Sequence, residues 1–347
     1  MTLRIIEISA PESASDKIKD LAERYEAIDI WHRKSHKNWF DKDQDSRETT
    51  RILINVHNQQ DLIDALTRVT QKNENWRILL LPVEASLPRG DNEADTSQDK
   101  KKKTIKDILK GSVTREELME DISKGGQLSM DYVLLVFLSA IVAGIGLIQS
   151  DVAVVIGAMV IAPLLGPNLA LAFGAALGDK KLITQSIQTN IVGLCLTLVI
   201  AVLMGLFVAS DTVFNSTEIM NRTNVSYGKI FLALAAGGAA VLSLTTGVSS
   251  ALVGVMVAVA LLPPAVSFGI LMGKTEWDMA LSAGLLLLTN IVSINLAALS
   301  VFRLKGIKPR TWYEEKAAKK ASRINAAFMI GALIILAILI TLKSNIN

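Results

Sequence analysis

The sequence predicts a polytopic α-helical membrane protein with about seven spans and an N-terminal α+β domain of the ferredoxin-like type. Three observations lead to this fold class. Half of the 347 residues are hydrophobic, although only 5% are aromatic. The charged residues are concentrated outside one long apolar region that begins near Tyr132. Within that region two stretches repeat each other about a hundred residues apart, which indicates a duplicated membrane unit.

Residues 1–85 alternate between strand-like and helix-like patterns in the order β-α-β-β-α-β, which is typical of a ferredoxin-like domain. The strands are rich in β-branched residues or alternate with period two, and the helices carry apolar residues at helical spacing. The expected strands are Leu3–Ile8, Ile28–Arg33, Arg51–His57 and Trp76–Val83, and the expected helices are Asp16–Ala27 and Gln60–Gln71. Domains of this kind bind small ligands, metals or one another, so the fold alone selects no function.

His32, His36 and His57 raise the question of a metal site, since adjacent strands bring them near one another. Their spacing matches no common metal-ligand pattern, and solvated or core histidines are the better interpretation. We therefore expect no metal. The single cysteine, Cys195, lies inside an apolar run. This excludes a disulfide framework and favours a small packing residue.

Residues 86–130 are expected to form a flexible linker and a juxtamembrane helix. The stretch 86–103 is polar, charged and without periodicity, which is typical of a flexible tether. Lys100–Lys103 either contact anionic lipid headgroups or solvate the tether. Thr114 and Glu117 form a capping box, and Gly125 is a stop signal, so a short helix is predicted over Thr114–Lys124.

Residues 131–304 are expected to form a duplicated transmembrane domain with halves at 131–209 and 228–303. Residues 305–347 are expected to form a basic cytoplasmic connection and a final span. Each apolar segment has roughly the ~17–25 residues that a bilayer core requires. The seven predicted spans cover about 132–149, 152–177, 182–208, 229–246, 248–272, 279–302 and 325–342. Prolines interrupt the second and fifth, so these two either span or re-enter the membrane.

The distribution of basic residues predicts the orientation, since cytoplasmic loops are enriched in lysine and arginine. The hairpin Asp179–Lys181 holds two lysines, and eight basic residues lie between Arg303 and Arg323. The loop Ser210–Gly228 holds one arginine. The N-terminal apolar run is too short for a signal peptide. The head is therefore expected in the cytoplasm and the C-terminus outside.

The repeated stretches match at three ordered places. The matched positions are Gly157 and Met159 with Gly254 and Met256, Leu164–Pro167 with Leu261–Pro264, and Thr189–Val192 with Thr289–Val292, at offsets of 97 and 100 residues. A small insertion accounts for the change of offset. Because each copy holds three spans, an odd number, the second copy crosses the bilayer upside down relative to the first. We therefore expect an inverted repeat of three spans with one span added.

Inverted-repeat transporters commonly place their binding site near the bilayer midplane, where matching helices are broken. Proline frees carbonyl oxygens that lipid cannot satisfy, and neutral polar side chains lie at similar depth. The expected substrate-binding residues are Pro163, Gly166, Pro167, Asn168, Thr189, Asn190, Pro263, Pro264, Thr289 and Asn290. Ser293 and Asn295 add further polar groups. The segments Pro163–Asn168 and Leu262–Ala265 are expected to approach each other near the midplane.

A purely structural role for these side chains also stays open, because asparagine and threonine often bond across membrane helix interfaces. Glycines such as Gly144, Gly237 and Gly254 let helices pack closely. No Asp, Glu, Lys or Arg lies in the middle of any predicted span. This argues against a proton relay through carboxylates.

The sequence predicts no enzyme, since it lacks a Walker A loop, an H-E-x-x-H motif, a G-x-S-x-G elbow and an intramembrane carboxylate pair. We expect no catalytic residue and no cofactor, and the net charge of +3 is too small to indicate a nucleic-acid partner. The expected partners are the lipid bilayer, an unknown small solute or ion, and further copies of this chain in a homo-oligomer. A secondary transporter is the preferred function. The alternatives are an oligomeric channel and a membrane-anchored sensor or scaffold whose soluble head binds a ligand or partner.

The string GAMVIAPLLGPNLALAFGAALGD, the two TNIV tetrapeptides and the soluble head resemble an uncharacterised hydrophobic-domain family of bacterial and archaeal membrane proteins. The resemblance extends from Gln127 to about Phe302, and more loosely over the head. Its most specific part is the string MVIAPLLGPN. It implies a multi-pass protein of a prokaryotic inner (plasma) membrane and leaves the substrate undefined.

Overall fold

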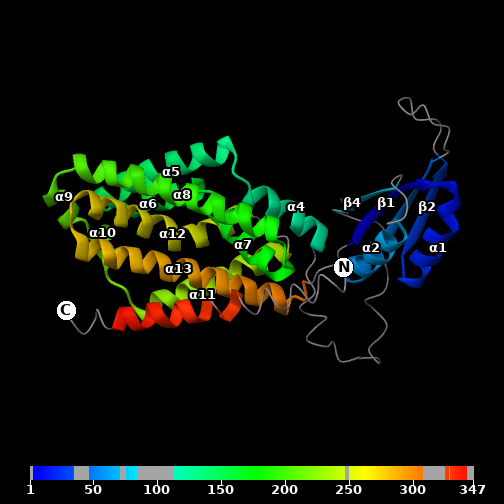
Figure 1. The fold of residues 1–347 in the computed structure, drawn as a ribbon. Helices are drawn as coiled ribbons and strands as arrows, with labels where there is room; N and C mark the ends of the chain where they lie inside the picture. Colours follow the sequence, from blue (N-terminus) through cyan, green and yellow to red (C-terminus); the bar gives the residue numbers. More distant parts are fainter. Residues whose placement is uncertain are drawn as a thin grey trace, which may run out of the picture. The chain divides into compact units, whose positions relative to one another are not determined.

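The computed structural model describes residues 3–34, 47–70, 76–83, 113–246, 250–307, 325–327 and 329–341. The chain divides into two compact units, Met1–Arg115 and Glu116–Asn347. Figure 1 shows that the first unit holds the sheet and that the second is helical. The predicted linker stretch 86–103, His36 and most of the basic connection before the last helix lie outside the described residues.

The first unit is built on a four-stranded antiparallel sheet with the strand order β2-β3-β1-β4. Its strands are β1 (Leu3–Pro11), β2 (Asp29–Lys34), β3 (Arg47–Asn55) and β4 (Arg77–Pro82). The turn η1 (Glu12–Ala14) and the helices α1 (Ser15–Arg24) and α2 (Val56–Thr70) complete the unit. Apart from η1, the elements follow the predicted order β-α-β-β-α-β.

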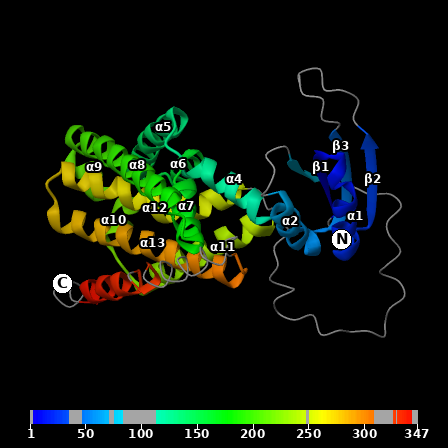
Figure 2. The same ribbon diagram turned by 45° about the vertical axis from the view of Figure 1, so that its right-hand side comes forward.

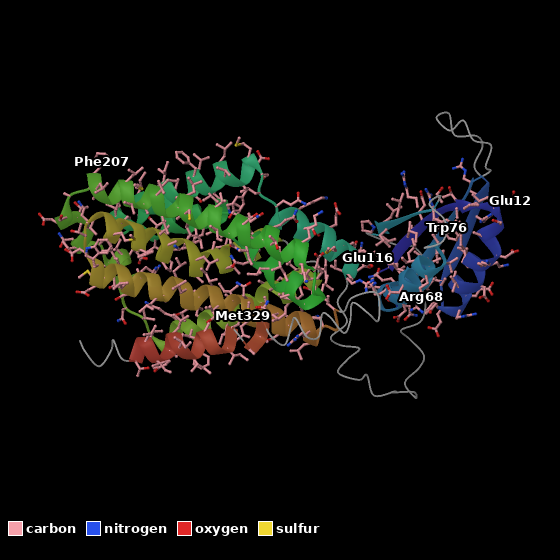
Figure 3. The ribbon with its side chains drawn as sticks, in the orientation of Figure 1. Glu12, Arg68, Trp76, Glu116, Phe207 and Met329 are labelled. Atoms are coloured by element: carbon pink, nitrogen blue, oxygen red, sulfur yellow. The ribbon has the colours of Figure 1, made fainter. Side chains whose placement is uncertain are left out.

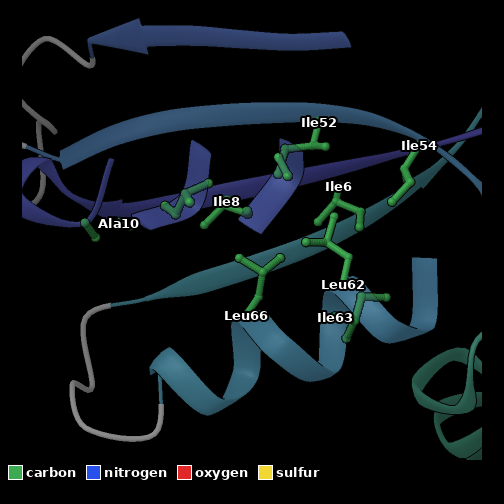
Figure 4. Packing of buried hydrophobic residues seen from close by; sticks show 11 residues of the cluster. Ile6, Ile8, Ala10, Ile52, Ile54, Leu62, Ile63 and Leu66 are labelled. Carbon is green, nitrogen blue, oxygen red and sulfur yellow. The ribbon is translucent and has the colours of Figure 1, made fainter. Parts of the chain in front are cut away.

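Alternating isoleucines place the core of this unit on one face of the sheet. In β1 the side chains of Ile6 and Ile8 are fully buried, and Ile6 pairs with Ile52 of β3. Figure 4 shows Leu62 and Leu66 of α2 pointing toward these strands. Side chains alternate between the faces of a strand, whereas residues four apart share one face of a helix. One apolar face of α2 therefore covers the isoleucine face of the sheet.

The boundary between β3 and α2 differs from the sequence prediction. The predicted strand Arg51–His57 is wrong in its last two residues, because α2 already begins at Val56. Val56 is buried and lies six and seven residues before Leu62 and Ile63, so it extends their helical face. Burial on that face therefore overrides the strand preference of a β-branched residue.

The second unit consists of helices. They are α4 (Arg115–Gly126, which begins at the boundary of the units), α5 (Met130–Gln149), α6 (Val152–Ile161), α7 (Leu165–Leu177), α8 (Lys180–Phe207), α9 (Ser210–Asn215), α10 (Thr217–Thr223), α11 (Tyr227–Thr246), α12 (Ser250–Gly273), α13 (Trp277–Leu304) and a helix over Asn325–Thr341. The short helices α9 and α10 occupy the predicted loop Ser210–Gly228, where the polar sequence gave no helical pattern.

Four of the described helices, α5, α8, α11 and α13, are long and apolar enough to cross a membrane. The bent pair of α6 and α7 makes a fifth candidate if it counts as one span. Val257–Gly273 within α12 and the helix Asn325–Thr341 are apolar but shorter. The structure is thus compatible with a polytopic membrane protein, and the predicted number of seven spans stays a prediction.

Two aspartates define where helices of the second unit begin. The Oδ1 atom of Asp151 accepts a hydrogen bond from the backbone of Ala153 at 2.9 Å and caps α6. The Oδ1 atom of Asp179 accepts one from Lys181 at 2.9 Å and caps α8. The first amides of a helix have no partner within the helix, so each carboxylate stabilises the start of the helix that follows it.

The second predicted span is broken at its proline. Helix α6 ends at Ile161, α7 begins at Leu165, and the two are bent by 52°. Pro163 lies between them; it supplies no backbone N–H, and its ring disfavours helical geometry in the preceding residue. The interruption therefore lies where the sequence predicts it.

The fifth predicted span is not broken, because α12 stays helical with Pro263 and Pro264 inside it. The expectation that both proline segments interrupt their helices is wrong for this one. Pro264 leaves the carbonyl of Ala260 without its helical donor. The Nδ2 group of Asn290 in α13 donates to that carbonyl at 2.7 Å. The neighbouring helix therefore replaces one of the two hydrogen bonds that Pro263 and Pro264 remove, and α12 continues.

The long helices approach one another closely at glycines. Helix α8 packs against α12, and α11 packs against α13 (Figures 1 and 2). A Cβ atom at Gly205 of α8 would overlap the backbone of Ile270 in α12, and one at Gly237 of α11 would overlap that of Ile294 in α13. Backbone-to-backbone contact of this kind is typical of membrane helix interfaces.

Large apolar side chains cover the outside of the helical unit. Phe207, labelled in Figure 3, is 88% exposed, and Phe231 and Leu304 are 71% and 67% exposed. Extended apolar surface of this kind is rare in water-soluble monomers. Lipid chains are as apolar as these side chains and solvate them without cost.

Candidate membrane-embedded site

Three asparagine side chains from α7, α8 and α13 form a chain of hydrogen bonds inside the helical unit. The Nδ2 group of Asn295 donates to Oδ1 of Asn168 at 3.0 Å. The Nδ2 group of Asn168 donates to Oδ1 of Asn190 at 3.1 Å. Asn168 and Asn295 are buried, and Asn190 is partly buried. The chain therefore links three helices through neutral polar groups in apolar surroundings.

Backbone carbonyls fix the orientation of these amides. The Nδ2 group of Asn168 also donates to the Leu164 carbonyl at 2.8 Å, and that of Asn295 donates to the Ile291 carbonyl at 2.9 Å. A carbonyl only accepts hydrogen bonds, so the amide nitrogen must face it. The oxygen of each amide consequently points the other way. Among the described residues, Oδ1 of Asn295 has no hydrogen-bond partner.

The chain lies beside the break between α6 and α7. Asn168 is the fourth residue of α7, and its amide bonds the carbonyl of Leu164, the residue that precedes the helix. Asn168 therefore stabilises the first turn after the break and at the same time faces α8 and α13. A broken helix next to convergent neutral polar groups is the usual arrangement of transporter binding sites.

The start of α7 also faces the C-terminal end of α4. A Cβ atom at Gly166 would overlap the carbonyl oxygen of Gly125, so the two backbones are in contact there. The Oγ1 atom of Thr189 in α8 donates to the Gly126 carbonyl at 2.9 Å. The hydroxyl of Tyr132 donates to the Thr189 carbonyl at 3.2 Å. These contacts hold the end of α4 and the start of α5 against α7 and α8.

A pocket of about 320 Å³ opens beside this junction. Its lining residues are Gln127, Leu128, Gln185, Gln188 and Thr189. Three of the five carry amide or hydroxyl groups from α8, near the end that the basic-residue pattern assigns to the cytoplasmic side. The pocket lies at one end of the helical unit and is polar, as an entrance to a buried polar site would be.

Thr289 and Asn290 take part in different contacts from their counterparts in the first copy. Both threonine hydroxyls donate to the carbonyl four residues earlier in their own helix, Thr289 to Leu285 at 2.7 Å and Thr189 to Gln185 at 3.0 Å. Only the Thr189 hydroxyl also reaches α4. Asn290 bonds the Ala260 carbonyl next to Pro263 and Pro264, whereas Asn190 bonds Asn168. The predicted residues thus fall into one group around Asn168 and another around Asn290.

Helix α12 packs against both α6 and α7, so the two proline-bearing elements are neighbours. The predicted approach of Pro163–Asn168 to Leu262–Ala265 stays a prediction. Sequence reasoning noted Asn295 as a polar group at similar depth but did not place it in the site. Its bond to Asn168 connects positions far apart in the chain, and no pattern in the sequence indicates that pairing.

In the first unit, His32 is engaged by neighbouring side chains. Its Nδ1 atom lies 2.9 Å from Oγ1 of Thr50, and its Nε2 atom lies 2.6 Å from Oε2 of Glu48. Ser15 Oγ lies 3.3 Å from the same Nε2 atom. Within the part of the chain that the structure describes, no three His, Cys, Asp or Glu side chains gather as metal ligands would. The side chain of His57 lies outside that part.

These features define a class of helical protein that is compatible with a membrane and carries a small antiparallel sheet domain. A family model described as Domain of unknown function (DUF389) matches residues 159–296. Over 320 residues the chain is 31% identical to an uncharacterized protein of Methanocaldococcus jannaschii, and the match covers 92% of this chain and 93% of that protein. The chain belongs to this DUF389 family, as its resemblance predicted. No solved structure matches it.

Proposed function

We propose that this protein is a secondary transporter of the inner membrane that moves a small solute or ion. Its site lies where α7, α8 and α13 meet beside the break between α6 and α7. The observation that carries the proposal is the chain Asn295–Asn168–Asn190. Polar side chains inside a membrane are costly to bury and commonly mark transport pathways.

The proposed architecture has seven spans, a cytoplasmic head and an inverted repeat of three spans. Five candidate spans by length and composition, together with α12 and Asn325–Thr341, give the required seven. The repeated sequence Thr189–Val192 and Thr289–Val292 lies in α8 and α13, which supports their equivalence. The second copy would then run opposite to the first, because three spans separate equivalent points.

The chemistry of the site favours a substrate without strong charge. Asparagine offers one acceptor and two donor hydrogens, and no carboxylate or basic side chain lies in the middle of the apolar helices. A strongly charged substrate would therefore be met by helix ends and backbone groups alone. A small polar solute or a monovalent ion fits neutral amides better.

A sensor or scaffold function has one specific observation in its favour. The sheet face opposite the helices carries Trp31, Leu79 and Leu81, which are 45%, 44% and 39% exposed. They alternate with core-facing residues such as Ile78 and Leu80 and so share the uncovered face. Trp31 lies on one edge strand and the two leucines lie on the other, and exposed apolar side chains on a sheet face can form part of a binding surface. A head that binds a partner there would serve signalling rather than transport.

Reconstitution of the full chain into liposomes tests the proposal. Osmotic swelling would be followed by light scattering with a panel of small sugars, amino acids and alkali-metal salts. A transporter gives saturable, solute-selective entry, whereas a channel gives entry that rises linearly with concentration. Asn190→Leu should reduce the rate while the protein stays folded and inserted, because leucine suits a membrane helix.

The control Asn221→Leu makes the same exchange in the short helix α10 and should keep the full rate. Absence of solute entry above empty liposomes for every solute in the panel would favour the sensor or scaffold. A loss of folding in Asn190→Leu, with normal entry in the remaining folded protein, would assign the asparagine a structural role only.

A further inference from the structure

Two buried oxygen atoms lie on adjacent turns of α13, apart from the three-asparagine chain. Asn290 is 5% exposed and Ser293 is fully buried. Neither Oδ1 of Asn290 nor Oγ of Ser293 has a hydrogen-bond partner among the described residues. Residues three apart lie on the same helix face, with Cβ atoms about 5–6 Å from each other. The two oxygens therefore belong to one local environment.

The amide nitrogen of Asn290 places this environment at the interface between α13 and α12. It donates to the Ala260 carbonyl of α12 at 2.7 Å. Because a carbonyl cannot donate, nitrogen and oxygen of this amide cannot be exchanged. The remaining atom of the amide, Oδ1, is therefore an oxygen, which only accepts hydrogen bonds. A buried acceptor without a partner costs free energy, so a species that satisfies Oδ1 would stabilise the folded protein.

The surroundings restrict what such a species can be. Both oxygens are buried away from solvent, so their partner would have to be small, such as a single ion or a water molecule. Divalent cations prefer sites with carboxylate ligands, and the middle of α12 and α13 has none. An amide and a hydroxyl oxygen are hard, neutral ligands, which suit a small monovalent cation.

We propose that Asn290 Oδ1 and Ser293 Oγ are two ligands of a binding site for a small monovalent cation of sodium size between α12 and α13. Ion binding would also stabilise α12 at its prolines. Asn290 would hold the ion through Oδ1 while its Nδ2 group bonds the Ala260 carbonyl, which Pro264 leaves without a donor. If the protein is the secondary transporter proposed above, this ion is its coupling ion; the binding site itself does not depend on that function.

Cation-dependent stability of the purified full chain in detergent tests this site. The unfolding temperature would be measured against sodium, lithium and potassium chloride, with N-methyl-D-glucamine chloride keeping the ionic strength constant. We expect a saturable rise that differs among the three cations by size. An equal rise with all three, or none, would overturn the proposal and leave a water molecule as the partner of the two oxygens.

Ser293→Ala with Ser300→Ala as its control assigns the effect to the site. Ser300 lies on the same helix, is exposed and donates to the Leu296 carbonyl. Ser293→Ala removes one ligand but breaks no hydrogen bond to another described residue. Without cation, the variant should therefore fold as well as the unmodified protein. The midpoint cation concentration should rise about tenfold or more, and Ser300→Ala should leave it unchanged. An unchanged midpoint in Ser293→Ala would exclude Ser293 as a ligand.

Binding and transport can fail separately in these experiments. Cation-dependent stability without solute entry into liposomes would keep the site and remove the transporter. Solute entry without any cation effect on stability would keep the transporter and remove the site.

Discussion

The side chain of Asn168 takes part in three hydrogen bonds inside the helical unit. It accepts from Asn295, donates to Asn190 and also donates to the Leu164 carbonyl. Each of its hydrogen-bonding groups has a neutral partner, so no charge is buried. Hydrogen bonds in such a chain strengthen one another in apolar surroundings, so the loss of one member weakens the others.

The polar residues of this region were predictable from the sequence, but their pairing was not. Asn168 and Asn190 stand out because they interrupt apolar runs. The bond from Asn295 joins positions 127 residues apart and depends on how three helices pack. A single sequence holds no pattern for such a contact, whereas proline chemistry alone predicted the break near Pro163.

Asn295→Ala should lower the free energy of unfolding by about 1 kcal/mol, because Oδ1 of Asn168 then loses its donor in a buried place. Cys195→Ala is the matched control. Cys195 occupies the position one repeat earlier and is exposed, so its substitution should change stability by less than about 0.5 kcal/mol. Chemical unfolding in mixed micelles measures both. Equal stability of the two variants would show that the Asn295 bond contributes nothing.

At the scale of elements, the two proline segments show that the same sequence signal has two outcomes. Between α6 and α7 the chain leaves the helix, whereas α12 continues through Pro263 and Pro264. The difference lies in the neighbour, since Asn290 supplies the missing donor to Ala260. Neighbouring side chains are invisible when a helix is judged from its own sequence, and the prediction of a second break failed for this reason.

The contact between the end of α4 and the start of α7 could not be predicted from the sequence either. The sequence predicted the helix Thr114–Lys124 and its stop near Gly125, and α4 agrees with both within two residues. It did not show that Gly125 touches Gly166 at the start of α7. Glycine was interpreted only as a stop signal, although here it also provides room for a second backbone.

Gly166→Ala and Gly157→Ala add a methyl group at two positions of the bent pair α6 and α7. The space beside Gly166 is filled by another backbone, whereas the space beside Gly157 is open. A Cβ at Gly166 would overlap the backbone of Gly125, whereas nothing lies within 4 Å of one at Gly157. Gly157→Ala should raise stability by up to about 1 kcal/mol through helix propensity. Gly166→Ala should lower the unfolding temperature and expose α4 to protease. Stabilisation by both substitutions would contradict the contact between α4 and α7.

At the scale of the whole molecule, composition predicted a soluble head and a helical body, and the structure contains both a sheet unit and an apolar helical unit. The helices α5, α8, α11 and α13 begin and end within about two residues of their predicted spans. Length and hydropathy suffice for this, because a bilayer sets the length of a span. They do not reveal the relation between the two copies, which depends on the sidedness of their loops.

The central claim is that the two copies run in opposite directions through the membrane, and loop labelling tests it most directly. Lys180 and Thr275 follow α7 and α12, which the inverted repeat would make equivalent, and both are exposed. In a chain with Cys195→Ala, Lys180→Cys and Thr275→Cys would be introduced singly. Intact cells would then be treated with a membrane-impermeant maleimide. The inverted repeat predicts that Thr275→Cys reacts from outside, whereas Lys180→Cys reacts only after the membrane is opened. Reaction of both from the same side would contradict the inverted repeat and, with it, the proposed transport site.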